Sequence, residues 1–178
     1  IKRDEDYIIP FIKDALKIKP ELKFLASPWS PPKFMKNTRM MTFGGNLKSE
    51  YRKVYSEYIA KYIKEYEKIG INMDYITIQN EPLATQIWES CIYSAEEEID
   101  FAVNYLYPEF QKNNINTKIL IWDHNKEKLF DRAFKELSND VNKDRISGLA
   151  FHWYTGDHFE NIEIGYYSIL YTILELVE

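Results

Sequence analysis

The chain has 178 residues, of which 45% are hydrophobic and 29% are charged. These proportions are typical of a globular domain and exclude an intrinsically disordered tail. The net charge is −5 and the basic residues are scattered, so a concentrated positive surface for nucleic acid is not expected. Charged residues interrupt every apolar run well before the roughly 18 to 20 residues that cross a bilayer, so no transmembrane segment is expected either.

The cysteine content and the first residues limit the interpretation further. Cys91 is the single cysteine, so an internal disulfide framework is excluded. The chain begins with Ile1 instead of methionine, and its charged first residues do not resemble a signal peptide. We therefore expect the native N-terminus to be missing, and the sequence does not indicate a localisation.

The first seventy residues alternate between helix, strand and loop. Apolar positions with helical spacing predict a helix over 7–19, and a short apolar run predicts a strand over 22–26. The proline-rich stretch that begins at Ser27 ends this strand, and residues 33–48 lack periodicity and predict a long loop. An apolar stripe with a period of 3.6 residues then predicts a helix over 49–70, which ends at a glycine.

The same alternation continues to about residue 151. Apolar runs predict strands over 75–78, 118–122 and 146–151. Helices are predicted between them over 94–110 and 126–137, and the first of these begins with a capping-box sequence.

Continuously apolar strands separated by amphipathic helices predict a parallel sheet covered by helices, either a barrel or a doubly wound sheet. Polar or aromatic residues follow each of the four predicted strands. This favours a barrel, whose site collects side chains from many strands at the carboxyl rim, over a doubly wound sheet, which binds ligands at one switch point. The residues are Ser27, Trp29, Asn80, Glu81, Asp123, His124, His152, Trp153 and Tyr154.

A complete barrel has eight strand and helix units and typically about 250 residues, whereas this sequence predicts four strand units and one leading helix. We therefore expect an α/β fold that is a partial (β/α)8 TIM barrel. No glycine-rich phosphate loop follows a predicted strand, so nucleotide binding has no motif to support it.

Glu81 is the first candidate catalytic residue. It directly follows a predicted strand and lies between Asn80 and Pro82, so its carboxyl is expected at the rim of the sheet beside a side-chain amide. In a glycosidase, one carboxyl donates its proton to the departing oxygen, and the amide can hydrogen-bond the sugar 2-hydroxyl. For Glu81 taken alone, a surface glutamate at a strand end is the more common explanation.

Four motifs lie at the ends of the predicted strands, namely residues 25–32 (LASPWSPP), 77–82 (TIQNEP), 121–125 (IWDHN) and 150–154 (AFHWY). Asn80-Glu81-Pro82 after a strand is similar to the acid/base signature of the large clan of (β/α)8 glycosidases. In order and spacing, the four motifs together resemble the third to the sixth strand of glycoside hydrolase family 30, the glucosylceramidase-like enzymes. The loop segments 35–37 and 44–47 are similar as well.

The resemblance implies that the chain is the central part of a catalytic barrel, roughly strands 3 to 6 with their helices. Residues 1–178 would form one incomplete domain. The family-like region covers about 4–163, and the end of the chain at 164–178 is divergent.

The resemblance also implies an active site in which Glu81 is the general acid/base. Trp29 would form part of a glucose-binding pocket, where its indole offers a face for stacking and an N–H donor. His152 would contact sugar hydroxyls or the catalytic carboxylate. Taken singly, each residue also has a structural explanation: Trp29 can anchor its loop in the core, and His152 can be a buried structural histidine. The implied substrate-binding residues are Trp29, Asn80, Asp123, which would be oriented to assist the histidine, His152 and Tyr154.

Other aromatic and polar residues have simpler explanations. Trp153 is predicted to point to the opposite face of its strand and to pack there. The tyrosines of 51–66 are explained as the barrel-facing side of a helix, and Cys91, which has no adjacent base, as an inert thiol. The three histidines lack metal-ligand spacing, so we expect no metal and no other cofactor.

Double displacement requires a second carboxyl about 5 to 5.5 Å from the first, which acts as the nucleophile. In the resembled family it ends the seventh strand, but this sequence departs from the family pattern after 161–163. Glu175 has the wrong neighbours, and we do not assign it. Because further strands are missing too, we expect this chain alone to be inactive. It would belong to a longer product, receive its missing strands from another chain, or be the relic of a gene.

The sequence therefore favours a retaining hydrolase of β-glucosides such as glucosylceramide, with a carbohydrate or glycolipid as substrate. One alternative is a non-catalytic sugar-binding or structural remnant that keeps Trp29 and Asn80. Another is a related barrel glycosidase, such as a β-xylosidase, a xylanase or a β-1,6-glucanase. The missing remainder of the barrel is the protein partner that the resemblance implies.

Overall fold

The structure is a computed structural model that describes residues 2–137, 140–168 and 173–175, with the side chains of 2–137 and 141–164. Five parallel strands form one sheet in the order β1-β2-β3-β4-β5. The four predicted strands are confirmed, and β5 is a further strand that the sequence did not predict. The strands are β1 (Leu25–Ala26), β2 (Tyr75–Thr77), β3 (Lys118–Asn125), β4 (Gly148–His152) and β5 (Ile173–Glu175).

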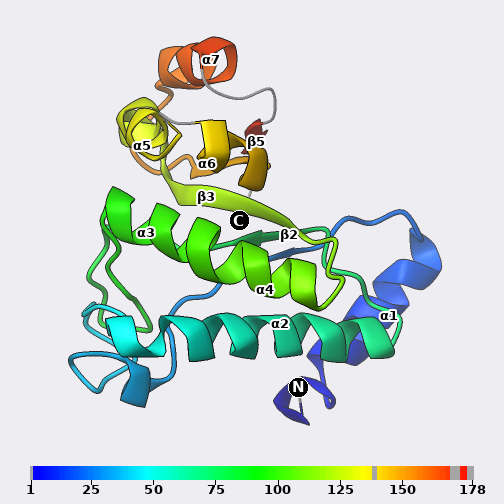
Figure 1. Cartoon of the computed structure of the whole chain (residues 1–178). Helices are drawn as coiled ribbons and strands as arrows, with labels where there is room; N and C mark the ends of the chain where they lie inside the picture. The colour runs from blue at the N-terminus through cyan, green and yellow to red at the C-terminus, as the bar shows by residue number, and fades with distance from the viewer. Residues whose placement is uncertain (1, 138–139, 169–172, 176–178) are drawn as a thin grey trace.

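Helices alternate with these strands along the chain (Figure 1). This alternation of strand and helix is the unit from which a (β/α)8 barrel is built. Among the helices of the described part, none combines the length and the apolar composition of a membrane span. The helices are α1 (Ile8–Ile18), α2 (Arg52–Lys68), α3 (Ala95–Phe101), α4 (Tyr107–Lys112), α5 (Leu129–Glu136), α6 (Asp140–Arg145) and α7 (Phe159–Ser168).

Helix α2 agrees closely with its prediction. Tyr55, Ile59, Ile63 and Tyr66 are buried at the helical spacing of three or four residues, so one stripe of the helix faces the protein interior. Gly70 follows the helix with a φ of +82°, a left-handed conformation that a glycine adopts without a steric cost. The predicted end of the helix at this glycine is confirmed.

The predicted helix over 94–110 is confirmed but is divided into two parts. The Ser94 hydroxyl accepts a hydrogen bond from the Glu97 backbone N–H, and the Glu97 carboxylate accepts one from the Ser94 N–H, so the capping box is present. A π-helical segment over 102–106 separates α3 from α4 shortly before Pro108. Proline has no N–H to continue a regular ladder, and a π-bulge is one way to accommodate it.

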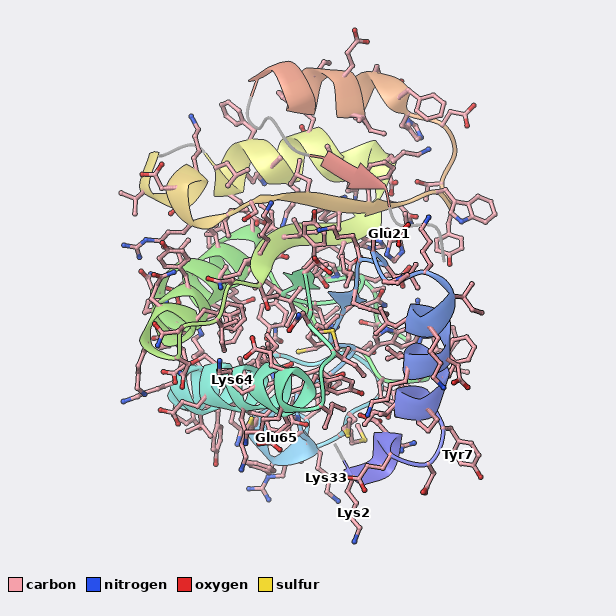
Figure 2. The ribbon with its side chains drawn as sticks, turned by 90° about the vertical axis from the view of Figure 1, so that its right-hand side faces the viewer. Lys2, Tyr7, Glu21, Lys33, Lys64 and Glu65 are labelled. Atoms are coloured by element: carbon pink, nitrogen blue, oxygen red, sulfur yellow. The ribbon has the colours of Figure 1, made fainter. Side chains whose placement is uncertain are left out.

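The main hydrophobic core lies between the sheet and helices α2 to α5. A smaller core joins α1 to the end of α2 and the segment that leads to β2. Charged side chains such as Lys33, Lys64 and Glu65 lie on the outside of this arrangement (Figure 2). The large core contains Ile63, Ile76, Phe101, Leu106, Ile121 and Leu129, and the small core contains Ile9, Tyr66, Ile71 and Met73.

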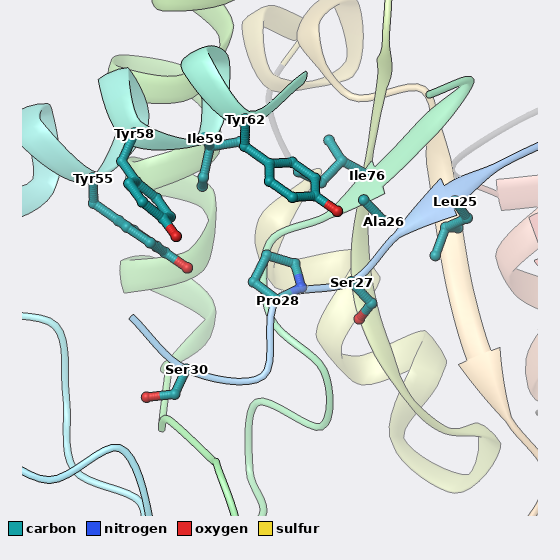
Figure 3. Close-up of a pocket in the computed structure, with 10 residues that line it drawn as sticks. All are labelled: Leu25, Ala26, Ser27, Pro28, Ser30, Tyr55, Tyr58, Ile59, Tyr62 and Ile76. Atoms are coloured by element: carbon teal, nitrogen blue, oxygen red, sulfur yellow. The ribbon is translucent and has the colours of Figure 1, made fainter. Parts of the chain in front are cut away.

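The β1 side of the sheet is incompletely covered. Ile8 and Phe11 on α1 are 51% and 76% exposed, although both are apolar positions of the predicted helix over 7–19. Within the described residues, no strand pairs with the outer edge of β1. Beside β1 lies a cavity of about 360 Å³, in which Tyr58 and Tyr62 of α2 approach Pro28 (Figure 3). An open parallel edge is the condition expected for a part of a barrel.

Candidate active site

A bulge at the end of β3 turns Asp123 into the protein. The pairing of β3 with β4 shifts register between Trp122 and His124, and Trp122 and Asp123 have φ values of +79° and +46°. This left-handed conformation is uncommon for residues other than glycine and concentrates at functional sites. A bulge re-aims the side chain that follows it, and Asp123 is here only 1% exposed.

Hydroxyl groups from two neighbouring strands hold the Asp123 carboxylate. The Thr77 hydroxyl on β2 donates to Asp123 Oδ2 at 2.6 Å. The Ser27 hydroxyl, directly after β1, donates to the same oxygen. Hydrogen bonds to a charged acceptor are stronger than neutral ones. The carboxylate therefore has a fixed orientation that leaves Oδ1 directed toward β4.

His152 connects Asp123 to Glu81. Its ring is 2% exposed, and Nε2 lies 2.9 Å from Asp123 Oδ1, while Nδ1 lies 3.5 Å from Glu81 Oε1. Because a carboxylate only accepts hydrogen bonds, the proton shared with Asp123 is on Nε2. Nδ1 thereby faces Glu81, and a proton on this nitrogen would give an ion pair with the Glu81 carboxylate.

Glu81 is fixed through its backbone and remains accessible through its carboxyl. It has a φ of +48°, and its N–H donates to the Asp123 carbonyl at 2.9 Å. The Gln86 side-chain amide lies 3.3 Å from Glu81 Oε2. The Glu81 side chain is 18% exposed, so a solute can reach a carboxyl whose position is set by β3 and β4. Such a group can exchange a proton with a bound molecule.

The other residues expected at the site lie around this centre. Asn80 is 7% exposed, and its Oδ1 has no hydrogen-bond partner among the described residues. The Tyr154 ring lies 5.8 Å from the His152 ring and is 53% exposed. The Trp29 carbonyl accepts a hydrogen bond from the Gln79 amide at 2.7 Å, and its side chain is 43% exposed. Direct contacts thus join Glu81, Asp123, His152 and Tyr154, whereas Trp29 is tied to the site by its backbone.

Residues that the sequence did not assign to the site also shape it. Ser27 and Thr77 hold Asp123, and Gln79 and Gln86 reach Trp29 and Glu81. One signal was present for Thr77, because it is a polar residue within the otherwise apolar predicted strand 75–78. For Gln79 and Gln86, which follow this strand, the sequence offers no such signal.

The prediction for Trp153 was wrong. Strand β4 ends at His152, so the alternation of a strand does not extend to the next residue. Trp153 is 57% exposed and stacks on Tyr154 with a centroid distance of 5.3 Å. Its ring therefore belongs to an exposed aromatic pair beside the site and not to the packing of the sheet.

His124 is a second histidine close to Glu81. Its ring lies 6.4 Å from the His152 ring and 5.1 Å from the Trp122 ring. Burial lowers the pKa of His124 below 6.5, while the negative charge of Glu81 opposes this shift and His152 adds to it. We expect His124 to be mostly neutral at pH 6.5, because its folded-state pKa lies below this pH.

Replacing Glu81 by glutamine is expected to lower the pKa of His124 further, since it removes a charge that favours the imidazolium. NMR titration of the histidine ring signals measures this shift in the chain as given, and Glu65→Gln on α2 is the matched control. A pKa of His124 above 6.5, or one that does not respond to Glu81→Gln, would show that these groups are not coupled as the geometry requires.

Among the described residues there is neither a metal-binding cluster nor an exposed thiol. Among them, no cluster of three or more His, Cys, Asp or Glu side chains forms a metal-binding arrangement. Cys91 is fully buried, and burial raises the pKa of its thiol to about 12. A thiol that remains protonated at neutral pH is a poor nucleophile.

Comparison with known proteins identifies the family. The profile described as "Glycosyl hydrolase family 30 TIM-barrel domain" matches residues 1–164. The crystal structure of SrfJ from Salmonella typhimurium superposes with a TM-score of 0.94 at 43% identity, over 99% of this chain and 40% of that one.

Two curated relatives represent different activities. The endo-1,6-beta-D-glucanase of Neurospora crassa is 37% identical over 61% of this chain and 24% of its own length. The lysosomal acid glucosylceramidase of Mus musculus is 28% identical over 86% of this chain and 32% of its own length. This chain thus spans a third or less of the length of these two relatives. The family profile and the superposed structure confirm the predicted α/β fold, a partial (β/α)8 barrel. The chain belongs to glycosyl hydrolase family 30 and forms part of its TIM-barrel domain.

Proposed function

We propose that this chain carries the acid/base half of a retaining β-glucoside hydrolase and that Glu81 is the general acid/base. The observation that carries this proposal is the contact chain from Glu81 through His152 to Asp123 at three adjacent strand ends. In a double displacement, the acid/base first protonates the departing oxygen and then deprotonates the attacking water. A carboxyl that is reachable from solvent and faces an imidazole is suited to both steps.

The neighbouring residues would bind the sugar. Asn80 Oδ1 is buried without a partner among the described residues, and a sugar hydroxyl can satisfy it as a donor, since a buried unpaired acceptor is costly. The exposed rings of Trp29 and Tyr154 offer apolar faces that suit the C–H surface of a pyranose. Asp123 would hold the His152 ring, and His152 would orient the Glu81 carboxyl through its contact with Oε1.

Asp123 is not suited to be the second carboxyl of a double displacement. Oδ1 contacts His152, Oδ2 accepts from Thr77 and Ser27, and the side chain is 1% exposed. Its oxygens are therefore occupied and shielded, whereas a nucleophile needs a lone pair directed at the substrate. Glu175 ends β5, but its side chain lies outside the described residues, and we leave it unassigned.

A further part of this proposal is that the remainder of the barrel packs against the open edge of β1. This edge, which is unpaired within the described residues, and the cavity beside it support this. Strands from the same polypeptide or from another chain would pair with β1 and fill the space that Tyr58 and Tyr62 border. The nucleophile would come with the part of the barrel that continues beyond β4, because the resembled family carries it at the end of the seventh strand. The chain of 178 residues is then expected to have no turnover by itself.

The substrate is proposed to be a β-linked glucoside, with glucosylceramide as the first candidate and β-1,6-glucan as the second. The names of the curated relatives support both. We expect the longest natural polypeptide that contains this sequence to release glucose from an aryl β-glucoside and from one of these two substrates, and to leave xylan intact. Product analysis on this panel separates the candidates. Cleavage of xylan alone would overturn the assignment to glucosides, and inactivity on the whole panel would favour a non-catalytic remnant.

A further inference from the structure

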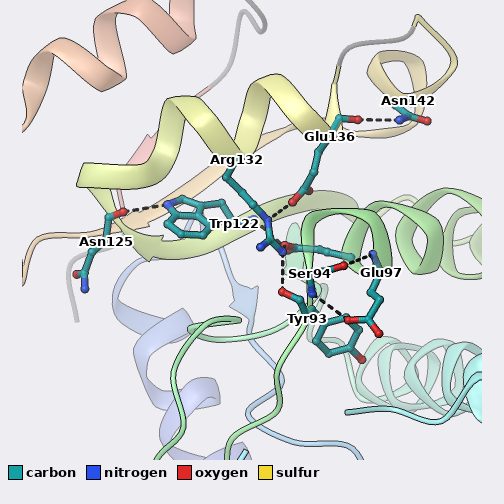
Figure 4. A network of polar contacts seen from close by, with 9 residues as sticks. Tyr93, Ser94, Glu97, Trp122, Asn125, Arg132, Glu136 and Asn142 are labelled. Carbon is teal, nitrogen blue, oxygen red and sulfur yellow. Dashed lines mark hydrogen bonds and ion pairs between the residues drawn. The ribbon is translucent and has the colours of Figure 1, made fainter. Parts of the chain in front are cut away.

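Arg132, Glu98 and Glu136 form a buried charged cluster beside Trp122, between strand β3 and helices α3 and α5 (Figure 4). Arg132 on α5 donates to Glu98 Oε2 on α3 at 2.6 Å and also binds the Glu136 carboxylate. Its guanidinium further donates to the Tyr93 carbonyl at 3.0 Å. The exposed fraction is 0% for both glutamates and 6% for the arginine. Burying such a cluster has a high desolvation cost, so it is weak evidence for stability and calls for another role.

Glu98 is the member of the cluster that contacts the bulge. The Trp122 backbone N–H donates to Glu98 Oε1 at 3.0 Å. In a regular parallel strand this N–H would take part in the ladder, but the left-handed conformation of Trp122 turns it toward α3. Arg132 also lies 5.6 Å from the Trp122 ring centroid. Glu98 thus satisfies a backbone donor that the bulge withdraws from the sheet.

The position of the bulge affects both acidic residues of the site. Asp123 follows Trp122 directly, and its side chain contacts His152. The Asp123 carbonyl accepts the Glu81 N–H at 2.9 Å. A change at the Trp122 N–H is therefore transmitted over one peptide unit to Asp123, and from there to Glu81.

We propose that Glu98 is a positioning residue that holds the Trp122–Asp123 bulge and, through it, Glu81 and His152. This inference rests on the proposed function of Glu81. Arg132 fixes the Glu98 carboxylate in turn, so the orientation of the acid/base is set from helices α3 and α5 on the opposite side of β3. Glu98 itself is fully buried, so it is shielded from a substrate that arrives from solvent.

The test compares Glu98→Gln with Glu136→Gln. Both variants keep the shape of the side chain and remove one carboxylate from Arg132, but the structure shows a contact with the Trp122 N–H only for Glu98. Since a charged acceptor is replaced by a neutral one, we expect Glu98→Gln to speed hydrogen exchange of the Trp122 and Glu81 amides about fivefold to tenfold. Glu136→Gln is expected to leave both amides within about twofold.

A second readout separates positioning from a loss of stability. In the longest natural polypeptide, Glu98→Gln is expected to lower kcat on a poor leaving group about tenfold with KM nearly unchanged, because only the proton transfer is misaligned. Equal exchange of the Trp122 amide in both variants would overturn the inference. If that exchange differs as expected while Glu81→Gln leaves turnover intact, the proposed function fails and the link from Glu98 to the bulge stands.

Discussion

In the longest natural polypeptide that contains this sequence, replacement of Glu81 by glutamine is expected to lower the hydrolysis of a β-glucoside with a poor leaving group by about 10²-fold to 10⁴-fold. Glutamine keeps the shape of the side chain and cannot donate a proton to the departing oxygen. With a dinitrophenyl leaving group, which needs no protonation, the first step should be largely preserved, and the second step should become rate-limiting. Steady-state and burst kinetics on the two substrates measure this difference.

Glu89→Gln is the matched control for this prediction. Glu89 lies in the same loop after β2, and its side chain is exposed, so its removal is expected to change the rate less than about twofold. Equal effects of Glu81→Gln on both leaving groups would indicate a general disturbance of the site. Unchanged turnover would remove Glu81 from the mechanism.

Replacement of Arg132 by methionine is expected to lower the free energy of unfolding at pH 7 by about 3 to 5 kcal/mol. The change leaves Glu98 and Glu136 buried beside each other without their shared cation. Urea unfolding followed by circular dichroism measures the loss. Arg52→Met is the matched control, because Arg52 and its partner Asp100 are partly exposed, and such a pair contributes about 0 to 1 kcal/mol.

The same cluster gives stability a dependence on pH. Burial and the charge of Glu98 raise the pKa of Glu136 well above its ordinary value of 4.5. Between 4.5 and the raised pKa the folded protein holds a proton that the unfolded chain releases, so stability falls as the pH rises through this window. Burial also raises the pKa of Glu98, which contributes in the same direction. Glu136→Gln should therefore reduce this fall and leave the protein more stable at pH 8. An undiminished fall in Glu136→Gln would locate its origin in another group.

The regular elements were predictable from local patterns. The stripe on α2 and the glycine after it set both ends of that helix, and the capping box at Ser94 set the start of α3. Helices α6 and α7 and strand β5 were not predicted. Helix α6 and strand β5 are short, and α6 is strongly polar, so their place depends on neighbours that are distant in sequence. Short elements of this kind carry little periodicity of their own. Helix α7 contains Gly165, which lowers its intrinsic helix propensity.

The candidate site was predictable to a more limited extent. Strand ends in register place Glu81, Asp123 and His152 on one rim, and the structure brings the three side chains together. The bulge at Trp122 was not predictable, because a bulky residue such as tryptophan rarely adopts left-handed backbone angles. The contacts of Ser27, Thr77 and Glu98 depend on this bulge. The polar position of Thr77 within a strand was visible in the sequence, but the partner of each of these residues was not.

Rescue of Glu81→Ala by azide tests most directly whether Glu81 is the acid/base of a retaining hydrolase. The longest natural polypeptide is assayed on dinitrophenyl β-glucoside. Azide attacks the anomeric carbon of the glycosyl-enzyme, breaks the bond to the enzyme carboxylate and needs no base. We predict that azide raises kcat and that NMR identifies β-glucosyl azide as the product. The absence of both acceleration and azide product, or the α-anomer, would contradict the account.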